Sequence, residues 1–157
     1  MTSINPVVST WKIYFKMIRK YKEEDIEAVI SSWRLSSELA HPFLTQESLD
    51  QESDNVRNVY MSLAETWVTE VNDHVVGFIS LIENEIGGLF LDPTYHRRGF
   101  GRAMVDMAVS EKGALLVEVF KENSIGRGFY NSYGFLKVDE FVHEASGQTT
   151  FRMSYSP

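Results

Sequence analysis

Strand-like segments recur along the whole chain. Alternation of apolar and polar residues indicates a half-buried strand, and a short apolar run between turn residues indicates a buried one. We therefore expect seven strands. The segments with these patterns are 13–19, 66–71, 74–82, 85–91, 114–120, 135–145 and 148–156.

Four helices are predicted where hydrophobic residues recur three and four positions apart. In the last of them, Ile125, Phe129 and Tyr133 fall on one stripe, which we expect to face the core. The predicted helices are 22–33, 45–64, 101–112 and 123–133.

Residues typical of helix ends and turns separate these segments. Thr45 is a good N-cap for the second helix, because its hydroxyl can accept a hydrogen bond from the first turn. Asn72 and Asp73 form a two-residue loop of the kind that joins hairpin strands with positive φ. Gly113 and Gly134 end the third and fourth helices.

The segment 85–91 is unusual for a strand because it contains Gly87 and Gly88. Glycine weakens a strand interior, so a pair of glycines there indicates a bulge, or a place where another backbone or a ligand comes close. The segment is therefore a candidate for function as well as for structure.

The element order is β-α-α-β-β-β-α-β-α-β-β. This order predicts an α/β protein with a central mixed, mostly antiparallel sheet and helices on both faces. The 157 residues, 43% of them hydrophobic, suffice for one substantial core. We expect a single domain over residues 1–157, with residues 1–10 loosely held.

Composition excludes several classes of function. The chain has no cysteine, which excludes disulfides, thiolate metal sites and a cysteine nucleophile. A net charge of −7 speaks against binding nucleic acid or an anionic membrane through overall charge. No leader-like or membrane-spanning stretch is evident, so we expect a cytoplasmic protein.

The turn before the third helix carries cations and glycines together. A helix that begins right after a strand presents free N–H groups and the positive end of its dipole, and glycines let an anion approach. Gly99 and Gly101 provide that access, and Arg97, Arg98 and Arg102 add positive charge. The turn fits a phosphate site, although a solvated turn with packed glycines remains the alternative. It matches neither a Walker loop nor a dinucleotide fingerprint.

Two motifs resemble the GNAT superfamily of acetyl-CoA-dependent N-acetyltransferases. That family's pyrophosphate motif is Gln/Arg-x-x-Gly-x-Gly/Ala, between the fourth strand and the third helix, and residues 96–101 read HRRGFG. Residues 123–135, NSIGRGFYNSYGF, resemble the segment Asn-x-x-Ala-x-x-Phe/Leu-Tyr-x-x-x-Gly-Phe. His96 and Gly126 are the departures. With the strand order, the resemblance covers roughly residues 13–155.

The resemblance implies where acetyl-CoA binds. In this family the fourth and fifth strands splay apart and the cofactor's pantetheine arm lies in the gap, bonded to the fourth strand. Backbone amides of the glycine turn hold the pyrophosphate, and an asparagine holds the arm from the far side. The residues given these roles here are Leu89, Phe90, Leu91, Arg97, Arg98, Gly99, Phe100, Gly101, Arg102 and Asn123.

The resemblance also implies catalytic residues. Tyr130 matches the tyrosine that protonates the departing thiolate, a feasible step for a phenol near the sulfur; packing beside Phe129 is the alternative. An alkyl ammonium must lose a proton before it can attack. Glu85 coincides with the general base of the histone-acetyltransferase branch, with Glu83 as the fallback; a plain turn role is the alternative for both.

His41 and Phe43 lie between the first two helices, a connection that commonly lines the acceptor side in this fold. His41 is a candidate base, substrate contact or helix-capping residue. The spacing of the four histidines predicts no metal site.

The expected activity is transfer of an acetyl group from acetyl-CoA directly to a primary amine of a small molecule or peptide, without nucleic acid, membrane or metal. The alternative is a non-catalytic CoA-binding module. The presence of Tyr130 and Glu85 favours the enzyme. The acceptor is not determined by the fold, and the sequence leaves a homodimer open.

Overall fold

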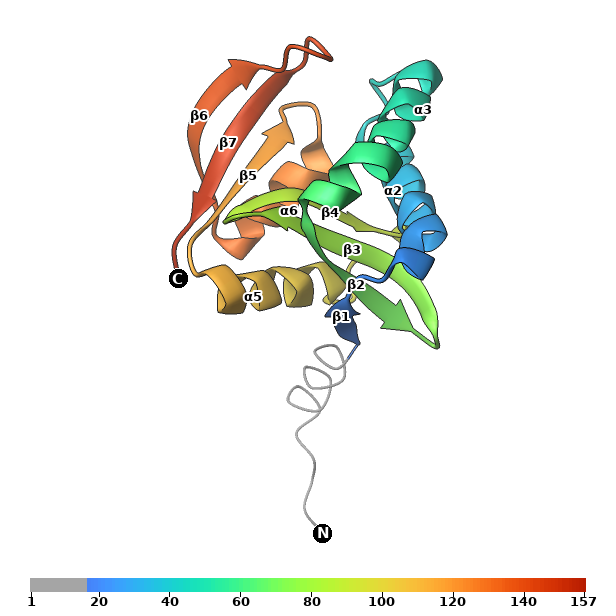
Figure 1. Ribbon diagram of the computed structural model, residues 1–157. Helices are drawn as coiled ribbons and strands as arrows, with labels where there is room; N and C mark the ends of the chain where they lie inside the picture. Colours follow the sequence, from blue (N-terminus) through green and yellow to red (C-terminus); the bar gives the residue numbers. More distant parts are fainter. Residues whose placement is uncertain (1–16) are drawn as a thin grey trace.

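The computed structural model describes residues 17–157 and contains a seven-stranded sheet (Figure 1). The strand order is β1-β2-β3-β4-β5-β7-β6. Neighbouring strands are antiparallel except β4 and β5, which are parallel. The bounds are β1 Ile18–Lys20, β2 Glu65–Val71, β3 His74–Ile82, β4 Glu85–Leu91, β5 Leu115–Phe120, β6 Leu136–Val142 and β7 Thr149–Tyr155.

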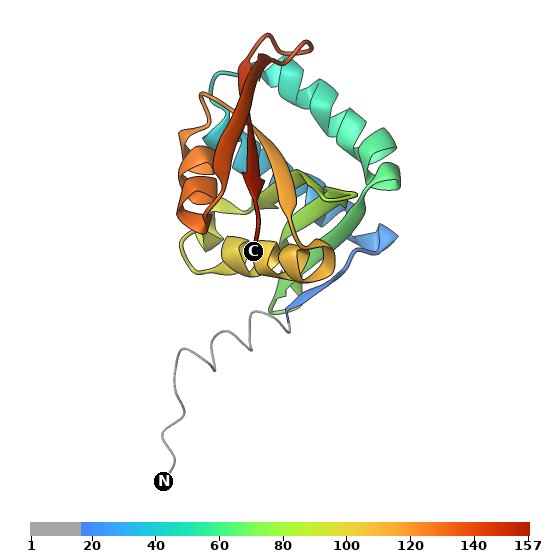
Figure 2. The same ribbon diagram turned by 90° about the vertical axis from the view of Figure 1, so that its left-hand side faces the viewer.

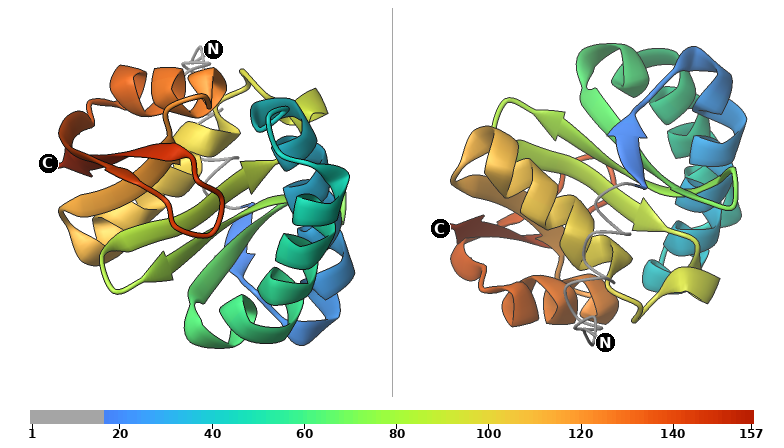
Figure 3. Two further views of the ribbon diagram at one scale, coloured as in Figure 1. Left: turned by 90° about the horizontal axis from the view of Figure 1, so that it is seen from above. Right: turned by 90° about the horizontal axis from the view of Figure 1, so that it is seen from below.

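Helices cover both faces of the sheet, as expected. Figures 1 and 3 show α2 and α3 on one side and α5 on the other, with α6 beside β5. The helical segments are the 3-10 turn η1 Glu23–Asp25, α2 Ile26–Ala40, α3 Gln46–Asn55, the π-helix η2 Val56–Tyr60, α4 Met61–Leu63, the 3-10 turn η3 Pro93–Tyr95, α5 Phe100–Lys112 and α6 Ser124–Tyr133.

Two apolar clusters, one on each face, hold these layers together. The cluster under α2 and α3 contains Val29, Trp33, Leu49, Val68 and Phe78. The larger cluster lies under α5 and α6 and joins all strands from β2 to β5 with β7. Alternate residues of β3 and β4 point into opposite clusters, which is why these central strands read as nearly continuous apolar runs.

Local sequence signals located several boundaries correctly. Thr45 caps α3, its Oγ1 accepting a 3.0 Å hydrogen bond from the Ser48 amide. Asn72 and Asp73 have φ values of 50° and 65°, as the hairpin loop requires. The predicted strand 85–91 is β4 residue for residue. Residues 1–10 and most of the predicted strand 13–19 lie outside the described residues, which include β1 from Ile18.

The helix predictions were wrong in three details. α2 continues past residue 33 to Ala40, because no glycine or proline interrupts it. Its buried face continues with serines, so the apolar pattern that indicates a helix ends before the helix does. The predicted helix 45–64 is interrupted by the π-helix η2. Ile125 is 43% exposed, whereas Tyr130 of α6 is buried. Ile125 lies roughly 140° around the helix from Tyr130, which places it outside the inner face.

The predicted splay of the fourth and fifth strands is present. β4 and β5 pair at Glu85 with Leu116 and at Ile86 with Val117, and β5 then continues alongside β7 over its whole length. In Figure 2 these two strands lie next to each other. The sheet is thus continuous at one end of β4 and open at the other.

Candidate active site

The candidate site lies where β4 separates from β5. The bulge expected at the glycine pair is present: Ser80 pairs with Gly88 and Leu81 with Ile86, so Gly87 is the extra residue. Gly87 is exposed although it lies inside a central strand. Main-chain groups that are open in the middle of a sheet can hydrogen-bond to a ligand that enters the gap.

Alternation along β4 decides which main-chain groups face this gap. The Asp92 amide donates to the Val76 carbonyl at 2.8 Å, which makes these residues a hydrogen-bonded pair of the antiparallel ladder. Two positions earlier, Phe90 therefore bonds to β3 in the same way, and the main chains of Leu89 and Leu91 face the β5 side. Leu89 is the best placed of the three to bond an extended ligand.

His96 ties the anion turn to the end of β4. Its Nε2 lies 3.1 Å from the Leu91 carbonyl, so that nitrogen carries the proton and the carbonyl is occupied. The His96 amide also donates to the Pro93 carbonyl. Histidine at this motif position thus orients the turn through β4, and the turn's amides remain in place although the residue departs from the family pattern.

The turn before α5 has the geometry of an anion site. Arg97 and Gly99 have positive φ values of 61° and 89°, which turn the chain sharply into the helix. The Ala103 amide is paired with the Gly99 carbonyl. Within residues 17–157 no acceptor is found for the amides of Gly101 and Arg102, which point from the positive end of the α5 dipole.

Aromatic rings position two of the three cations at this turn. The Arg98 guanidinium lies 5.4 Å from the centre of the Tyr95 ring, and that of Arg102 lies 5.2 Å from the Tyr133 ring. Arg97 is exposed. The guanidiniums remain at the surface, where they can bind a phosphate without the cost of burying their own charge.

Tyr130 lies on the buried face of α6. Its ring packs edge-on against Phe129 and Phe135, with centroids 5.2 and 5.1 Å away. Burial raises the pKa of the Tyr130 phenol above its ordinary value, because the phenolate would lose its hydration. The group stays neutral and can donate a hydrogen bond, but it is a weaker acid than an exposed tyrosine.

Glu85 lies at the apex of the gap and shares an arginine with a second carboxylate. Arg152 Nη2 on β7 lies 3.3 Å from Glu118 Oε1 on β5 and 3.9 Å from Glu85 Oε1. The three side chains are about one-third exposed and come from three neighbouring strands. Two carboxylates around one guanidinium leave the apex acidic.

Glu83 has a different setting. It lies in the β3–β4 turn with a φ of 55° and is exposed. Its backbone strain and position suit the turn role, whereas Glu85 is the first residue of β4 and belongs to the sheet.

His41 and Asn123 are joined, although they are far apart in the sequence. Asn123 Oδ1 accepts a 2.8 Å hydrogen bond from the Gly126 amide and so caps α6, and its Nδ2 lies 3.2 Å from His41 Nε2. A Cβ at Gly126 would lie 2.5 Å from Asn123 Nδ2. Glycine in place of the family's alanine therefore makes room for the asparagine as it turns toward His41.

Burial lowers the pKa of His41 to about 4. The neutral imidazole accepts the hydrogen bond from Asn123, and a proton on Nε2 would remove it. His41 also packs against Phe43 and Phe120, with ring centroids 5.5 and 5.1 Å away, and Phe120 packs against His143. This aromatic group closes the end of β5 next to α6.

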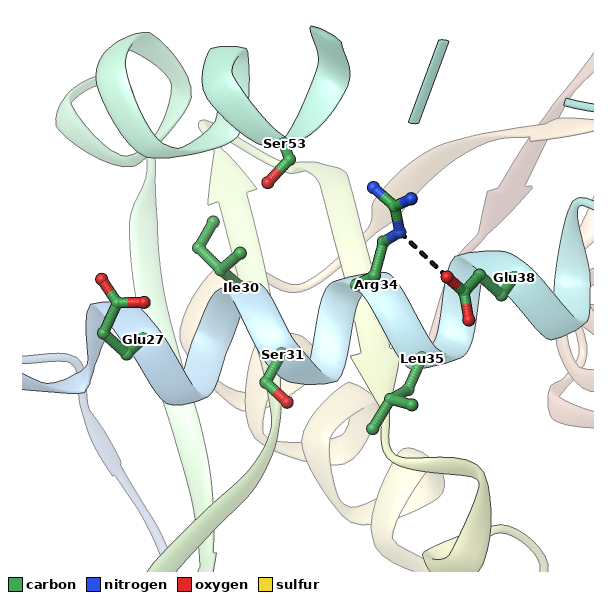
Figure 4. A pocket seen from close by; sticks show the side chains of 7 residues that line it. All are labelled: Glu27, Ile30, Ser31, Arg34, Leu35, Glu38 and Ser53. Carbon is green, nitrogen blue, oxygen red and sulfur yellow. Dashed lines mark hydrogen bonds and ion pairs between the residues drawn. The ribbon is translucent and has the colours of Figure 1, made fainter. Parts of the chain in front are cut away.

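A surface groove lies elsewhere, between α2 and α3. Figure 4 shows Ile30 and Arg34 of α2 pointing toward Ser53 of α3. None of the predicted site residues lines it, and Arg34 is already paired with Glu38 and Asp50. We place the site at the β4–β5 gap because the open main chain, free amides and paired carboxylates are there.

Within the described part of the chain no cluster of three or more histidine, aspartate or glutamate side chains could hold a metal ion. In the same residues no helix is long and apolar enough to cross a membrane.

Comparison with known proteins identifies the family. Residues 62–137 match the acetyltransferase (GNAT) domain, a span that contains β2 to β5, the anion turn and Tyr130. The chain is 33% identical over 119 residues to the peptidyl-lysine N-acetyltransferase YjaB of Escherichia coli (strain K12), covering 75% of this chain and 80% of that protein. The chain belongs to the GNAT acetyltransferase family. It is a GNAT N-acetyltransferase, as the two motifs predicted.

Other relatives agree with this assignment. The peptidyl-lysine N-acetyltransferase YiaC of E. coli (strain K12) is 29% identical over 140 residues, covering 88% of this chain and 96% of that protein. The solution structure of apo YjaB from E. coli aligns with a TM-score of 0.80, 29% identity, and coverage of 88% and 95%. PaiA N-acetyltransferase from Thermoplasma acidophilum, solved in complex with coenzyme A, aligns at 0.72 with 20% identity, covering 88% and 98%, and supports the fold.

Sequence reasoning missed several residues that the structure places at the candidate site. Glu118 and Arg152 stand beside Glu85 because β5 and β7 are its neighbours in the sheet, a pairing that is not local in sequence. Strand alternation did hold one signal: Glu118 is a polar residue inside the buried run 114–120. Tyr60, whose ring reaches Gly87, gave no signal at all.

The His41 environment predicts a pH dependence of stability. The folded-state pKa of about 4 lies below the ordinary 6.5, so the unfolded chain binds this proton first as the pH falls. His41 should therefore lower the free energy of unfolding by on the order of 3 kcal/mol between about pH 7 and pH 4. Urea unfolding of wild type and His41→Gln at several pH values measures the difference, and a pH-independent difference would contradict it.

Gly101→Glu should abolish binding of acetyl-CoA. A Cβ at Gly101 would lie 3.2 Å from the Phe129 ring, and a carboxylate there would repel the phosphates at the start of α5. Calorimetric titration measures the affinity, and a thermal melt verifies folding. Gly128→Glu is the matched control, since nothing lies within 4 Å of a Cβ at exposed Gly128. Equal binding by both variants would remove the turn from the site.

Proposed function

We propose that this GNAT enzyme transfers an acetyl group from acetyl-CoA to the side-chain amine of lysine in a peptide or protein. The observation that carries the proposal is the β4–β5 gap, with free amides at α5 and carboxylates at its apex. YiaC and YjaB, both peptidyl-lysine N-acetyltransferases, support the acceptor class. Small-molecule amines are the competing class.

The anion turn and β4 would hold acetyl-CoA. The amides of Gly101 and Arg102, with the guanidiniums of Arg97, Arg98 and Arg102, suit a pyrophosphate. Leu89 offers main-chain groups to the pantetheine arm, whose peptide-like amides can pair with an open strand. The residues present therefore fit the co-substrate predicted from the motifs.

Glu85 would remove the amine's proton through water. It lies at the apex, its side chain is about one-third exposed, and Arg152 Nη2 lies 3.9 Å from its Oε1. Because a lysine ammonium has an ordinary pKa near 10.4, the proton must leave before the nitrogen can attack. The acidic apex also attracts the cationic side chain of lysine.

Tyr130 would stabilise the departing thiolate by donating a hydrogen bond to sulfur. Its raised pKa makes full proton transfer unfavourable, whereas a fixed donor in a buried site is effective without ionising. The nitrogen–carbon bond forms as the carbon–sulfur bond breaks. The chain has no cysteine to carry the acetyl group, so transfer is direct.

Tyr130→Phe should lower kcat about 100-fold and leave acetyl-CoA affinity nearly unchanged, because one hydroxyl donor is lost from the transition state. Thiol release from acetyl-CoA with lysine peptides and small amines measures turnover, without background since the protein has no thiol. Tyr155→Phe is the control, a hydroxyl deletion in the same aromatic cluster. Unchanged kcat in Tyr130→Phe would remove Tyr130 from the mechanism. Acetyl-CoA binding without release from any amine would favour the non-catalytic module.

Glu85→Gln should lower kcat about 100-fold at neutral pH, since the amide cannot accept the proton. Steady-state rates with saturating lysine peptide between pH 6 and pH 10 test this, and the loss should shrink at high pH, where the free amine is already abundant. Glu83→Gln serves as the comparison because Glu83 lies in the exposed turn. A larger loss in Glu83→Gln would transfer the role to Glu83.

A further inference from the structure

The Tyr60 hydroxyl is buried and has no hydrogen-bond partner in residues 17–157. An unpaired buried hydroxyl is costly, since it has lost water without gaining another bond. Such a group calls for an explanation, and a catalytic role is one of those it can have. Tyr60 is not part of either motif of the family, and the roles of Glu85 and Tyr130 do not involve it.

The ring of Tyr60 contacts the candidate site from the side of the sheet that η2 covers. Tyr60 is the last residue of the π-helix η2 and its hydroxyl lies against Gly87, so closely that a Cβ at Gly87 would overlap it. Gly87 is the bulged residue of β4, directly after the last pair that β4 forms with β5. The hydroxyl therefore lies at the apex of the gap, on the side covered by η2.

The local backbone positions this side chain. A π-turn inserts an extra residue into a helix and rotates the residues after it, and such turns are frequent at functional sites. Here it separates α3 from α4, and Tyr60 is where it ends. The bulge at Gly87 and the π-helix η2 are two departures from regular structure, and the Tyr60 hydroxyl lies where they contact each other.

The electrostatic setting suits a cationic side chain. Burial, and then the charge of Glu85, raises the pKa of Tyr60 to about 12, so the phenol is neutral at physiological pH and can both donate and accept a hydrogen bond. The charge that acts on this phenol is that of Glu85, which Arg152 links to Glu118. An amine at this position would find a neutral acceptor beside a carboxylate.

We propose that Tyr60 is a further catalytic residue of the acetyl transfer, whose hydroxyl oxygen accepts a hydrogen bond from an N–H of the acceptor amine. This bond orients the nitrogen lone pair toward the gap between β4 and β5. It also supplies the partner that the hydroxyl lacks. The inference rests on the proposed function, because it assigns the acceptor's position within that same site.

The test compares Tyr60→Phe with Thr69→Val. Both variants delete a buried hydroxyl without a partner in the described residues, but Thr69 lies on β2, outside the site. Each should fold with a thermal midpoint equal to or above that of wild type, because an unsatisfied polar atom is removed. Both should bind acetyl-CoA as wild type does in calorimetric titration.

The kinetics with a lysine peptide separate the two variants. Tyr60→Phe should lose about tenfold or more in kcat/KM for the peptide with KM for acetyl-CoA unchanged, whereas Thr69→Val keeps wild-type values. Calorimetric binding of the peptide to the CoA-saturated protein should weaken in Tyr60→Phe alone. Gly87→Ala, which displaces the ring, should reproduce the loss.

Three outcomes would overturn the inference. Wild-type kcat/KM in Tyr60→Phe would show that the hydroxyl does not meet the amine. A fall in thermal midpoint in Tyr60→Phe, with loss of acetyl-CoA binding, would assign Tyr60 a structural role. If wild type neither binds nor acetylates lysine peptides, the proposed function fails, and the inference fails with it; activity in wild type together with unchanged Tyr60→Phe defeats the inference alone.

Discussion

The short pairing between β4 and β5 is the constraint on which the rest of the site depends. A central strand that leaves main-chain groups unpaired loses stability unless water or a ligand satisfies them. β5 tolerates the opening because each of its residues pairs with β7 on the other edge. The bulge at Gly87 turns β4 away just after Ile86, so the two strands separate within one residue of their last contact. The gap is therefore a product of backbone register, before any side chain is considered.

The two ends of this gap carry opposite charge. The positive end of α5 with Arg97, Arg98 and Arg102 lies at the mouth, and Glu85 and Glu118 lie at the apex. A net charge of −7 would repel an anionic co-substrate, so the cations must be local. The anionic end of acetyl-CoA and a cationic amine would thus be drawn to different ends of one cleft, which sets their relative orientation before any reaction.

The sequence predicted those features that depend on neighbours in the chain. The limits of β4, the cap at Thr45, the positive φ of Asn72 and the glycine turn before α5 all depend on residues a few positions apart. Features that depend on tertiary contact were not predictable in this way. The interruption of helix 45–64 at η2, and the meeting of Arg152 with Glu85 across β5, require the assembled sheet. The family motifs predict the cofactor side from local sequence for the same reason, since their residues act mainly through local backbone.

The link between His41 and Asn123 joins the two sides of the site. Asn123 has little capacity left: its amide donates to the Phe120 carbonyl, its carbonyl accepts from the Arg127 amide, and its side chain bonds to Gly126 and His41. The second hydrogen of Nδ2 is what it can offer to a pantetheine arm. Its direction is set by His41, which belongs to the connection between α2 and α3 and not to α6. In the proposed site the connection that carries His41 therefore sets how Asn123 is presented to the cofactor, and a substrate that displaces His41 would change the contact of Asn123 with the cofactor through a single hydrogen bond.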